Sequence, residues 1–547
     1  MRIRRKRLAV FLLAVLLISA PIALQVVASS ISPPPHLAQH EYWPAAAGDM
    51  EVVPSGTLEE LKDFETHLPI VVVEFFGKPR APTVWNKEKG YREPVKYDPF
   101  SEGKFYLYHN EDGGVNRLGD TPVLQTNTRA RLRGNSSLSF AKQQYLIKMY
   151  NEDGTKNRQD LLGMGADWEW VLNISYVDKS LLRNYMCLNL GAKIMGYAPE
   201  VRYCEVFQKE GEQYEYLGLY LMMESVKQGE SRVDIPDYDA HFAEASYLLC
   251  RDRFDENRTI LDTYATREGL TPGYLAVRYP GTNEITERTV SYIEEDISRL
   301  EKALFSEDIN EFLTYRDLID MESAADYFII NEFFANYDAG FNSYYLYKSI
   351  GGKLKFGPVW DFDQAIDNNR PYILEIESTA MHDGAWFRQM LRDGEFVKLI
   401  INRYQELRQG VLSDAYLDQF IDDTIAFLGN AAVRDWNRWQ YNDHEALYRD
   451  SPTGKVHETL LSNTRNFEEE IAHIKQVLKE HGAWLDNHID SLYQFSVVEP
   501  GHRKETAADT VLTFLFGEGQ VNWIAGILVI QMMVIFFVSI TLIQREA

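Results

Sequence analysis

The chain has 547 residues, of which 45% are hydrophobic and 25% charged, so it has the composition of a folded protein with material for two or more domains. It carries 56 Lys and Arg against 81 Asp and Glu, a formal net charge of -25. This acidic balance argues against a general nucleic-acid binder, because counterion release from a phosphate backbone needs a basic surface. The cysteines Cys187, Cys204 and Cys250 allow at most one disulfide and form no CxxC zinc pair, so we expect small buried side chains.

The N-terminus combines a basic head with a long apolar segment. Five Lys or Arg residues precede a stretch without charge over residues 8–28, which is long enough to cross a bilayer. We therefore expect an anchor at residues 1–28, with a signal peptide cleaved before Ser29 as the alternative. Residues 29–66 are rich in Pro, Ala and Ser, which predicts a tether.

Alternating strand and helix patterns follow. The apolar periodicity predicts strands at 68–77, 105–109, 129–134, 144–150, 202–208, 214–226, 245–250 and 274–280. It predicts helices after a capping Asp178 and over residues 321–336. The fold class is therefore α+β, and we place the main domain at residues 67–395.

The C-terminal part has a different sequence pattern from the main domain. A charged helical pattern predicts an α-helical lobe or extension at residues 396–495, and a linker follows over 496–520. Residues 521–544 carry no charge and predict a second transmembrane helix, after which Arg545 follows. Basic residues outside both spans place both termini in the cytoplasm and the main domain outside the cell membrane.

Residues 335–369 are the most informative segment for chemistry. Gly351–Gly352 suits a two-residue hairpin turn, since both positions tolerate positive φ. If this hairpin pairs Ile350 with Lys353, Asn342 lies beside Asp361 across the ladder. Asp338 would then lie on the incoming loop and Asp363 on the outgoing loop.

Such a group of acidic and amide oxygens is costly unless a cation neutralises it. Oxygen ligands favour Mg²⁺, Mn²⁺ or Ca²⁺ over zinc. The same register also places Lys348 opposite Lys355, which is unfavourable. Solvated turn residues are the alternative interpretation of this segment alone.

A second segment, residues 131–150, has the features of a phosphate-binding loop and strand. The sequence RGNSS begins at Arg133 and offers a Gly and two hydroxyls whose backbone amides can approach phosphate oxygens. Lys148 follows on a predicted strand, where its ammonium could reach a phosphate. A Gly/Ser loop, a strand Lys and a distal metal cluster together are the parts of a phosphoryl-transfer site.

These motifs together resemble the spore coat protein H (CotH) kinase-like family. The matching stretches, in order, are RGNSS with the Lys-containing strand, YVDKSLLRNYMCLNLG, YLGLYLMMESVK, NYDAGFNSYYLYK and GPVWDFDQAI. The resemblance covers residues 68–392 and leaves out the ends. It implies an atypical, two-lobed protein-kinase-like fold that transfers the γ-phosphoryl group of ATP to Ser or Thr of a protein.

The resemblance also implies roles for individual residues. Asp338 resembles the catalytic base, and Asn342 and Asp361 resemble the metal ligands, with Asp363 as a further acid. Lys148 resembles the lysine that grips the α and β phosphates. The spacing departs from ordinary kinases, because Asp338 and Asn342 are four residues apart and Asp363 replaces the Gly of the DFG motif. There is also no GxGxxG loop.

Further residues are assigned to the nucleotide and to the frame of the site. Arg133 and Ser136 of the RGNSS loop are expected to bind ATP, and Glu224 is expected to pair with the strand lysine or to contact the nucleotide. Arg183 and Asn184 either brace the site or form a helix-surface ion pair or cap.

The sequence therefore predicts a membrane-anchored, outward-facing kinase that uses ATP with Mg²⁺ or Mn²⁺. Its expected partners are a surface or envelope protein as substrate and membrane lipid through two helices, with no nucleic acid. The alternative is a non-catalytic assembly or binding module that keeps the fold and a cation site. A glycan-cleaving enzyme ranks last, because no pair of acids in separate environments is apparent.

Overall fold

The computed structural model describes residues 36–43, 53–110, 114–253, 255, 257–368, 376–441, 464 and 466–502. Both apolar segments predicted to span a membrane, residues 8–28 and 521–544, lie outside these ranges. None of the helices within these ranges has the length and apolar character needed to cross a bilayer.

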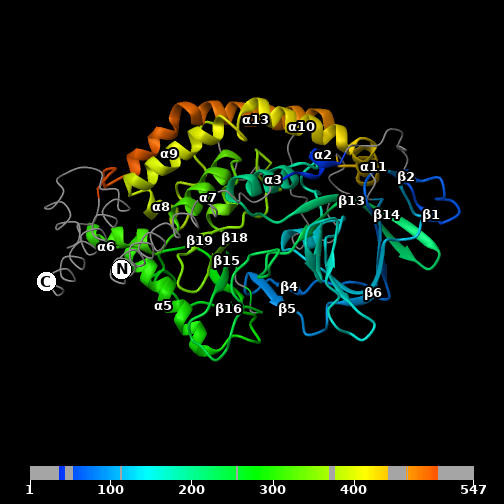
Figure 1. Ribbon diagram of the computed structural model, residues 1–547, viewed down its shortest axis with the longest axis horizontal. Coiled ribbons are helices and arrows are strands. Elements are labelled where there is room, and N and C mark those ends of the chain that lie inside the picture. Colours follow the sequence, from blue (N-terminus) through cyan, green and yellow to red (C-terminus); the bar gives the residue numbers. More distant parts are fainter. Residues whose placement is uncertain are drawn as a thin grey trace, which may run out of the picture.

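The fold is mixed α+β and contains two main sheets (Figure 1). The larger sheet, called the closed sheet here, closes on itself because β13 pairs with both β3 and β14. Its pairings are antiparallel except for β3 with β13. Its strands are β1 (Gly56–Thr57), β3 (Ile70–Phe75), β6 (Ser101–Tyr108), β8 (Leu124–Leu132), β9 (Tyr145–Tyr150), β12 (Glu169–Asn173), β13 (Val201–Glu210) and β14 (Gln213–Glu224).

The second sheet, called the open sheet, has the order β16-β17-β15-β18-β19 and lies beside the closed sheet in Figure 1. Its strands are β15 (Tyr247–Asp252), β16 (Thr259–Ile260), β17 (Tyr274–Tyr279), β18 (Tyr344–Lys348) and β19 (Lys355–Phe356). Short paired strands complete the β structure: β2 (Glu65–Thr66) with β7 (Asn116–Arg117), β4 (Thr83–Asn86) with β5 (Tyr91–Pro94), and β10 (Gln159–Asp160) with β11 (Ala166–Asp167).

Helices connect and cover the two sheets. In Figure 1, α9, α10 and α13 run along one side of the molecule over both sheets, and α3 lies centrally beneath them. The α-helices are α2 (Gln39–Tyr42), α3 (Arg183–Met195), α4 (Tyr264–Arg267), α5 (Glu287–Leu304), α6 (Ile309–Phe312), α7 (Met321–Phe333), α8 (Phe387–Met390), α9 (Gly394–Arg408), α10 (Asp414–Leu428), α11 (Asn430–Trp439) and α13 (Phe467–His488). The 3₁₀ turns are η1 (Ser136–Ser139), η2 (Leu313–Asp317), η3 (Tyr337–Gly340) and η6 (Ile489–Phe495).

Local sequence signals explain where the predicted elements begin and end. Helix α7 starts where the Asp320 side chain accepts a hydrogen bond from the Ser323 amide. Helix α3 ends at Gly196, whose φ of 80° is a left-handed conformation that favours glycine. The β13–β14 hairpin turns at Gly211, which has a φ of 62°. Helix α5 was not predicted from the sequence.

The register predicted for the hairpin at Gly351–Gly352 is wrong by one residue. Leu346 faces Phe356 and Tyr347 faces Lys355, so Lys348 does not oppose Lys355. The reason is the turn: the Gly352 amide donates to the Ser349 carbonyl at 2.9 Å, and the observed register leaves three residues, 350–352, in the turn instead of two. The ladder also stops at Phe356, so Asn342 and Asp361 are not cross-strand neighbours.

Part of the predicted tether is packed structure. Ala38 and Trp43, which flank α2, are buried, and His40 contacts the Tyr185 hydroxyl of α3. Leu61 and Phe64 belong to a small apolar cluster with Phe207. The tether prediction is therefore wrong for residues 36–43 and 53–66, because apolar and aromatic side chains between the Pro and Ala residues find buried sites on the fold.

The C-terminal helices share the hydrophobic core of the two sheets. Lys142, which follows the RGNSS loop, reaches the Asp435 carboxylate of α11 at 2.7 Å, and both side chains have no exposed surface. Asp435 also accepts the Leu219 amide of β14 at 2.7 Å. The same carboxylate lies against Gly218, where a Cβ atom would come within 2.3 Å of it. The helical region is thus joined to the closed sheet by a buried ion pair.

The three cysteines are free and buried, as predicted from their number and spacing. Burial raises the pKa of the Cys187 thiol well above its ordinary value, because the thiolate would be desolvated. These side chains therefore behave as small apolar groups.

We expect Asp435→Ala to destabilise the protein by about 3–5 kcal/mol, because it leaves the buried Lys142 ammonium without a counter-charge. The exposed Asp422, which pairs with Lys475 at 2.7 Å, provides the matched control, and Asp422→Ala should cost less than about 1 kcal/mol. Urea denaturation of both variants measures the difference. Equal, small effects would show that the helical region is not coupled to the closed sheet as described.

Candidate functional site

The acidic segment that follows β19 is held in an unusual backbone conformation. Asp361 has a φ of 64°, a left-handed value that is strained for a residue with a side chain. The Phe362 amide donates to the Asn184 side-chain oxygen at 2.8 Å, and Asn368 Nδ2 donates to the Asp363 carbonyl at 2.6 Å. Side-chain amides from α3 and from the segment itself therefore stabilise a conformation that the local sequence does not favour.

A buried arginine supports the same segment. Arg183 donates from Nε to the Ala365 carbonyl at 2.8 Å and from Nη2 to the Ile366 carbonyl at 3.0 Å. Its Nη1 lies 2.6 Å from Asp178 and 2.7 Å from Glu470. Of the two predicted roles for Arg183 and Asn184, the bracing role is confirmed, and the alternative of a surface ion pair or cap is wrong because Arg183 is fully buried.

The carboxyl groups of Asp361 and Asp363 lie close enough to influence each other's ionisation. Desolvation first, and then the nearby charge of Asp338, raise the pKa of Asp361 to about 6. Desolvation and the Asp361 charge raise the pKa of Asp363 well above its ordinary value. Because like charges at this range repel, a cation would stabilise the ionised pair. Asp361 is nevertheless solvent-exposed, so an ion could reach it.

Asp338 and Asn342 lie together at η3. The Asn342 amide nitrogen donates to Asp338 Oδ1 at 3.1 Å, and the Asn342 backbone amide donates to the Asp338 carbonyl at 2.8 Å. The charge of Asp338 acts on Asp361, Asp363 and also Asp252. Asp252 ends β15 and was not predicted, because it lies 86 positions before Asp338 in the printed sequence and no local motif marks it.

Positive charge faces this acidic group from the closed sheet. The Arg133 guanidinium stacks over the Trp360 ring at 5.2 Å, directly before Asp361 in the chain, and its charge lowers the pKa of Asp361. Arg133 also donates to the Gln144 side chain at 3.2 Å. Gln144 accepts from Asn173 at 3.2 Å, which in turn accepts from Asn184. A chain of amide side chains thus links Arg133 to the α3 residue that holds the acidic segment.

Lys148 lies on the same face of the closed sheet as Arg131. It faces Arg129 of β8 and Glu169 of β12, and its ammonium lies 3.4 Å from the Glu169 carboxylate. Phe100 and Trp168 pack around it, with their ring centroids 5.2 Å and 4.9 Å from the ammonium. Residues opposite each other in a sheet share a face, so Lys148 is on the side that carries Arg131 and Arg133.

Glu224 does not pair with Lys148, so that part of its prediction is wrong. Glu224 faces Trp170 of β12, one position along from Glu169, and therefore lies on the opposite face of the sheet from Lys148. It forms a buried ion pair with Arg232 and accepts the Tyr197 hydroxyl at 3.1 Å. Burial raises the pKa of Glu224, while Arg232 acts in the opposite direction. Sequence alone could not give the strand register that decides this.

The RGNSS loop is tightly shaped. Gly134 has a φ of 106°, and a Cβ there would lie 1.8 Å from Ser137 Oγ. The Gln144 side chain donates to Ser137 Oγ at 2.5 Å, and Arg92 of β5 donates to the Asn135 side chain at 2.9 Å. Ser136 is exposed at the start of η1, so its hydroxyl is accessible to a ligand.

The residues present fit a hard divalent cation bound together with phosphate. Within the ranges that the structure describes, no group of three or more His, Cys, Asp or Glu side chains could hold a metal ion by itself. Mg²⁺ commonly uses one or two carboxylates and completes its shell with water and substrate phosphates. The neighbouring carboxyl groups of Asp361 and Asp363 match that pattern, because a cation would neutralise their like charges.

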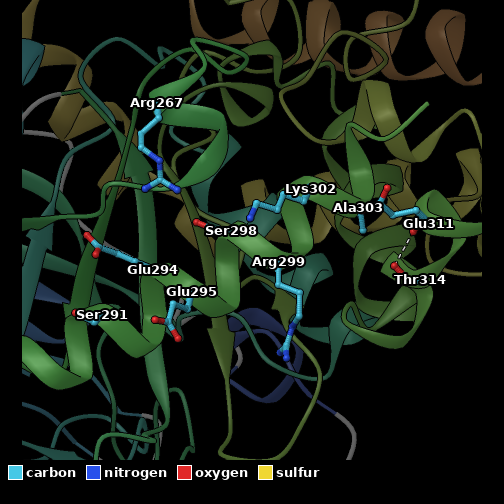
Figure 2. A pocket seen from close by; sticks show the side chains of 10 residues that line it. All are labelled: Arg267, Ser291, Glu294, Glu295, Ser298, Arg299, Lys302, Ala303, Glu311 and Thr314. Carbon is cyan, nitrogen blue, oxygen red and sulfur yellow. Dashed lines mark hydrogen bonds between the residues drawn. The ribbon is translucent and has the colours of Figure 1, made fainter. Parts of the chain in front are cut away.

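An open pocket of about 480 Å³ lies elsewhere, along one side of α5 (Figure 2). It is lined by side chains of both charges, including Arg267, Arg299 and Lys302 beside Glu294 and Glu295. None of the predicted site residues lines it. Its mixed charge does not select an anion or a cation.

The family model for the CotH kinase protein family matches residues 130–485, more than half of the chain. The chain therefore belongs to the CotH kinase family, as its motifs indicated, and the matched range extends through much of the C-terminal helical region. A kinase-like function follows from this membership. No curated protein matches the chain.

We expect Asp361→Asn to stabilise the protein at about pH 8 in the absence of metal. The pKa of Asp361 is raised to about 6 in the folded state, so ionising this carboxyl lowers the stability of the fold. The full loss is present above about pH 6, and there is no loss below about pH 4, where the carboxyl is protonated in both the folded and the unfolded chain. Asn tolerates the left-handed conformation, and solvent screening limits the gain to about 1 kcal/mol.

Thermal unfolding at about pH 8 and at about pH 4 measures this effect. Asp317→Asn, at an exposed site, is the control and should change stability at neither pH. A loss of stability in Asp361→Asn at about pH 8 would contradict the raised pKa.

Proposed function

We propose that this protein is a membrane-anchored, outward-facing CotH-type protein kinase. It transfers the γ-phosphoryl group of ATP to Ser or Thr of a surface or envelope protein. The observation that carries the proposal is the placement of Arg133, on the closed sheet, over Trp360 and close enough to Asp361 to shift its pKa. A polyanion and a cation would both find partners there.

Phosphoryl transfer depends mainly on positioning and on neutralising charge. Asp338 accepts a hydrogen bond from the substrate hydroxyl and orients it toward the γ-phosphorus. Asn342 supports this role, because its amide already fixes the Asp338 carboxylate at 3.1 Å. Arg133 and Lys148 contribute positive charge to the phosphates from the closed sheet.

Mg²⁺ or Mn²⁺ would be held by Asp361 and Asp363, with Asn342 as the amide ligand. Such an ion supplies charge neutralisation to the phosphates of the donor. The chain's own contribution is to keep two carboxyl groups together. The Phe362 amide, which donates to Asn184, and Asn368, which donates to the Asp363 carbonyl, accomplish this by fixing the backbone of the segment.

The membrane location rests on the two uncharged segments and the basic residues outside them. A reporter that is active only in the cytoplasm, fused after Glu546, should be active. Activity of an outward-only reporter at the same position would show that the C-terminus is outside and would refute this topology.

Transfer of radiolabelled phosphate from ATP to a protein acceptor, with Mg²⁺ or Mn²⁺, tests the function. We expect Asp338→Asn to reduce the rate at least about 100-fold, because an amide cannot take the proton of the acceptor hydroxyl as a carboxylate can. Asp361→Asn should cause a similar loss and should also weaken metal-dependent ATP binding.

Asp317→Asn should transfer phosphate at the wild-type rate, since Asp317 is exposed on η2. Absence of transfer in the folded wild type, with ATP and either metal, would favour the non-catalytic binding module instead. Full activity in Asp338→Asn would remove that residue from the mechanism.

A further inference from the structure

Two arginines of the open sheet lie side by side near the candidate site. Thr259 of β16 faces Val277 of β17, so Arg258 and Arg278 occupy the next opposed position of the same antiparallel pair. Opposed residues of a ladder share a face. The two guanidinium groups therefore extend from one face and one end of the open sheet.

That face is turned toward the acidic segment. Ala276, two residues before Arg278, faces Cys250, and Cys250 faces Tyr345 on the next strand. The Tyr345 ring packs edge-on against the Trp360 ring, with centroids 6.2 Å apart. Arg258 Nη1 lies 2.9 Å from Cys250 Sγ, which fixes it on this face.

Arg131 and Arg133 of the closed sheet approach the same place from the other side. Arg133 covers Trp360 at 5.2 Å, so this ring has an arginine of the closed sheet and a tyrosine of the open sheet as neighbours. The charges of Arg258 and Arg278 also act on Arg131. Burial first, and then the charge of Arg133, lower the pKa of Arg131 to about 10.

These four positive charges are poorly compensated. Arg258 is paired with Asp255 at 2.8 Å. Within the described ranges, Arg131, Arg133 and Arg278 form no ion pair with any carboxylate. Guanidinium groups that converge without carboxylate partners are costly unless an anion joins them, and their planar forks suit phosphate oxygens.

We propose that Arg258 and Arg278 bind the phosphate chain of the donor nucleotide, opposite Arg131 and Arg133. The triphosphate would then be gripped by both sheets, next to the Asp361–Asp363 pair. The phosphate chain is favoured over an acidic group of the protein acceptor, because Trp360, which Arg133 covers, directly precedes Asp361 of the proposed metal site. The identity of the donor rests on the proposed function, whereas the anion site itself does not.

Binding of ATP and of inorganic tripolyphosphate to the full chain, measured by calorimetry with Mg²⁺ present, tests the proposal. Arg278→Gln is the main variant, because Arg278 is exposed and its loss should not affect folding. We expect both ligands to bind about tenfold more weakly, as for loss of one charged hydrogen-bond donor. Arg258→Lys, which keeps the charge near Cys250, should lose less affinity than Arg258→Gln.

Arg288→Gln, a loss of the same charge at an exposed position on α5, should bind both ligands like the wild type. Unchanged tripolyphosphate affinity in Arg278→Gln, or no binding by the wild type, would overturn the proposal. If Arg278→Gln changed only the KM for the protein acceptor, the proposal would also be overturned, because the arginines would then bind that substrate. If Arg278-dependent binding is found but no transfer occurs, the kinase function fails and the anion site stands.

Discussion

The buried guanidinium of Arg183 connects the parts of the chain on which the candidate site depends. It joins Asp178 before α3, Glu470 on α13, and two carbonyl groups of the acidic segment. An arginine without exposed surface needs all of these partners, because an uncompensated buried charge costs several kcal/mol. The planar fork of the side chain satisfies two carbonyls and two carboxylates at once, which a lysine ammonium could not do with the same geometry.

This interaction also explains the spacing within the motif DKSLLRN. Asp178 accepts the backbone amides of Ser180 and Arg183 and contacts the Arg183 side chain, so it shapes the helix entry and neutralises its charge. Asn184, which directly follows Arg183, accepts a hydrogen bond from the Phe362 amide. The first turn of α3 therefore fixes the position of the acidic segment, although the two are far apart in sequence.

Local patterns were sufficient to predict most of the strands, helix α7 and the grouping of Asp338 with Asn342, because periodicity and short spacings are read within one element. Features that depend on strand pairing could not be predicted from local sequence patterns. A turn of three residues instead of two changed the β18–β19 register, and one step along β12 put Glu224 and Lys148 on opposite faces. Asp252, Arg258 and Arg278 were missed for the same reason, since only the assembled sheets bring them to the acidic segment.

The acidic pair is a source of instability that the fold tolerates. Asp361 has a strained φ of 64° and lies close to the like charge of Asp363, and both features cost free energy in the protein without a bound cation. Hydrogen bonds that Asn184 accepts, and that Asn368 and Arg183 donate, stabilise the backbone around it. A cation would remove the like-charge repulsion without any rearrangement of these supports. The cost is therefore incurred when the chain folds, so that cation binding does not have to overcome it again at each turnover.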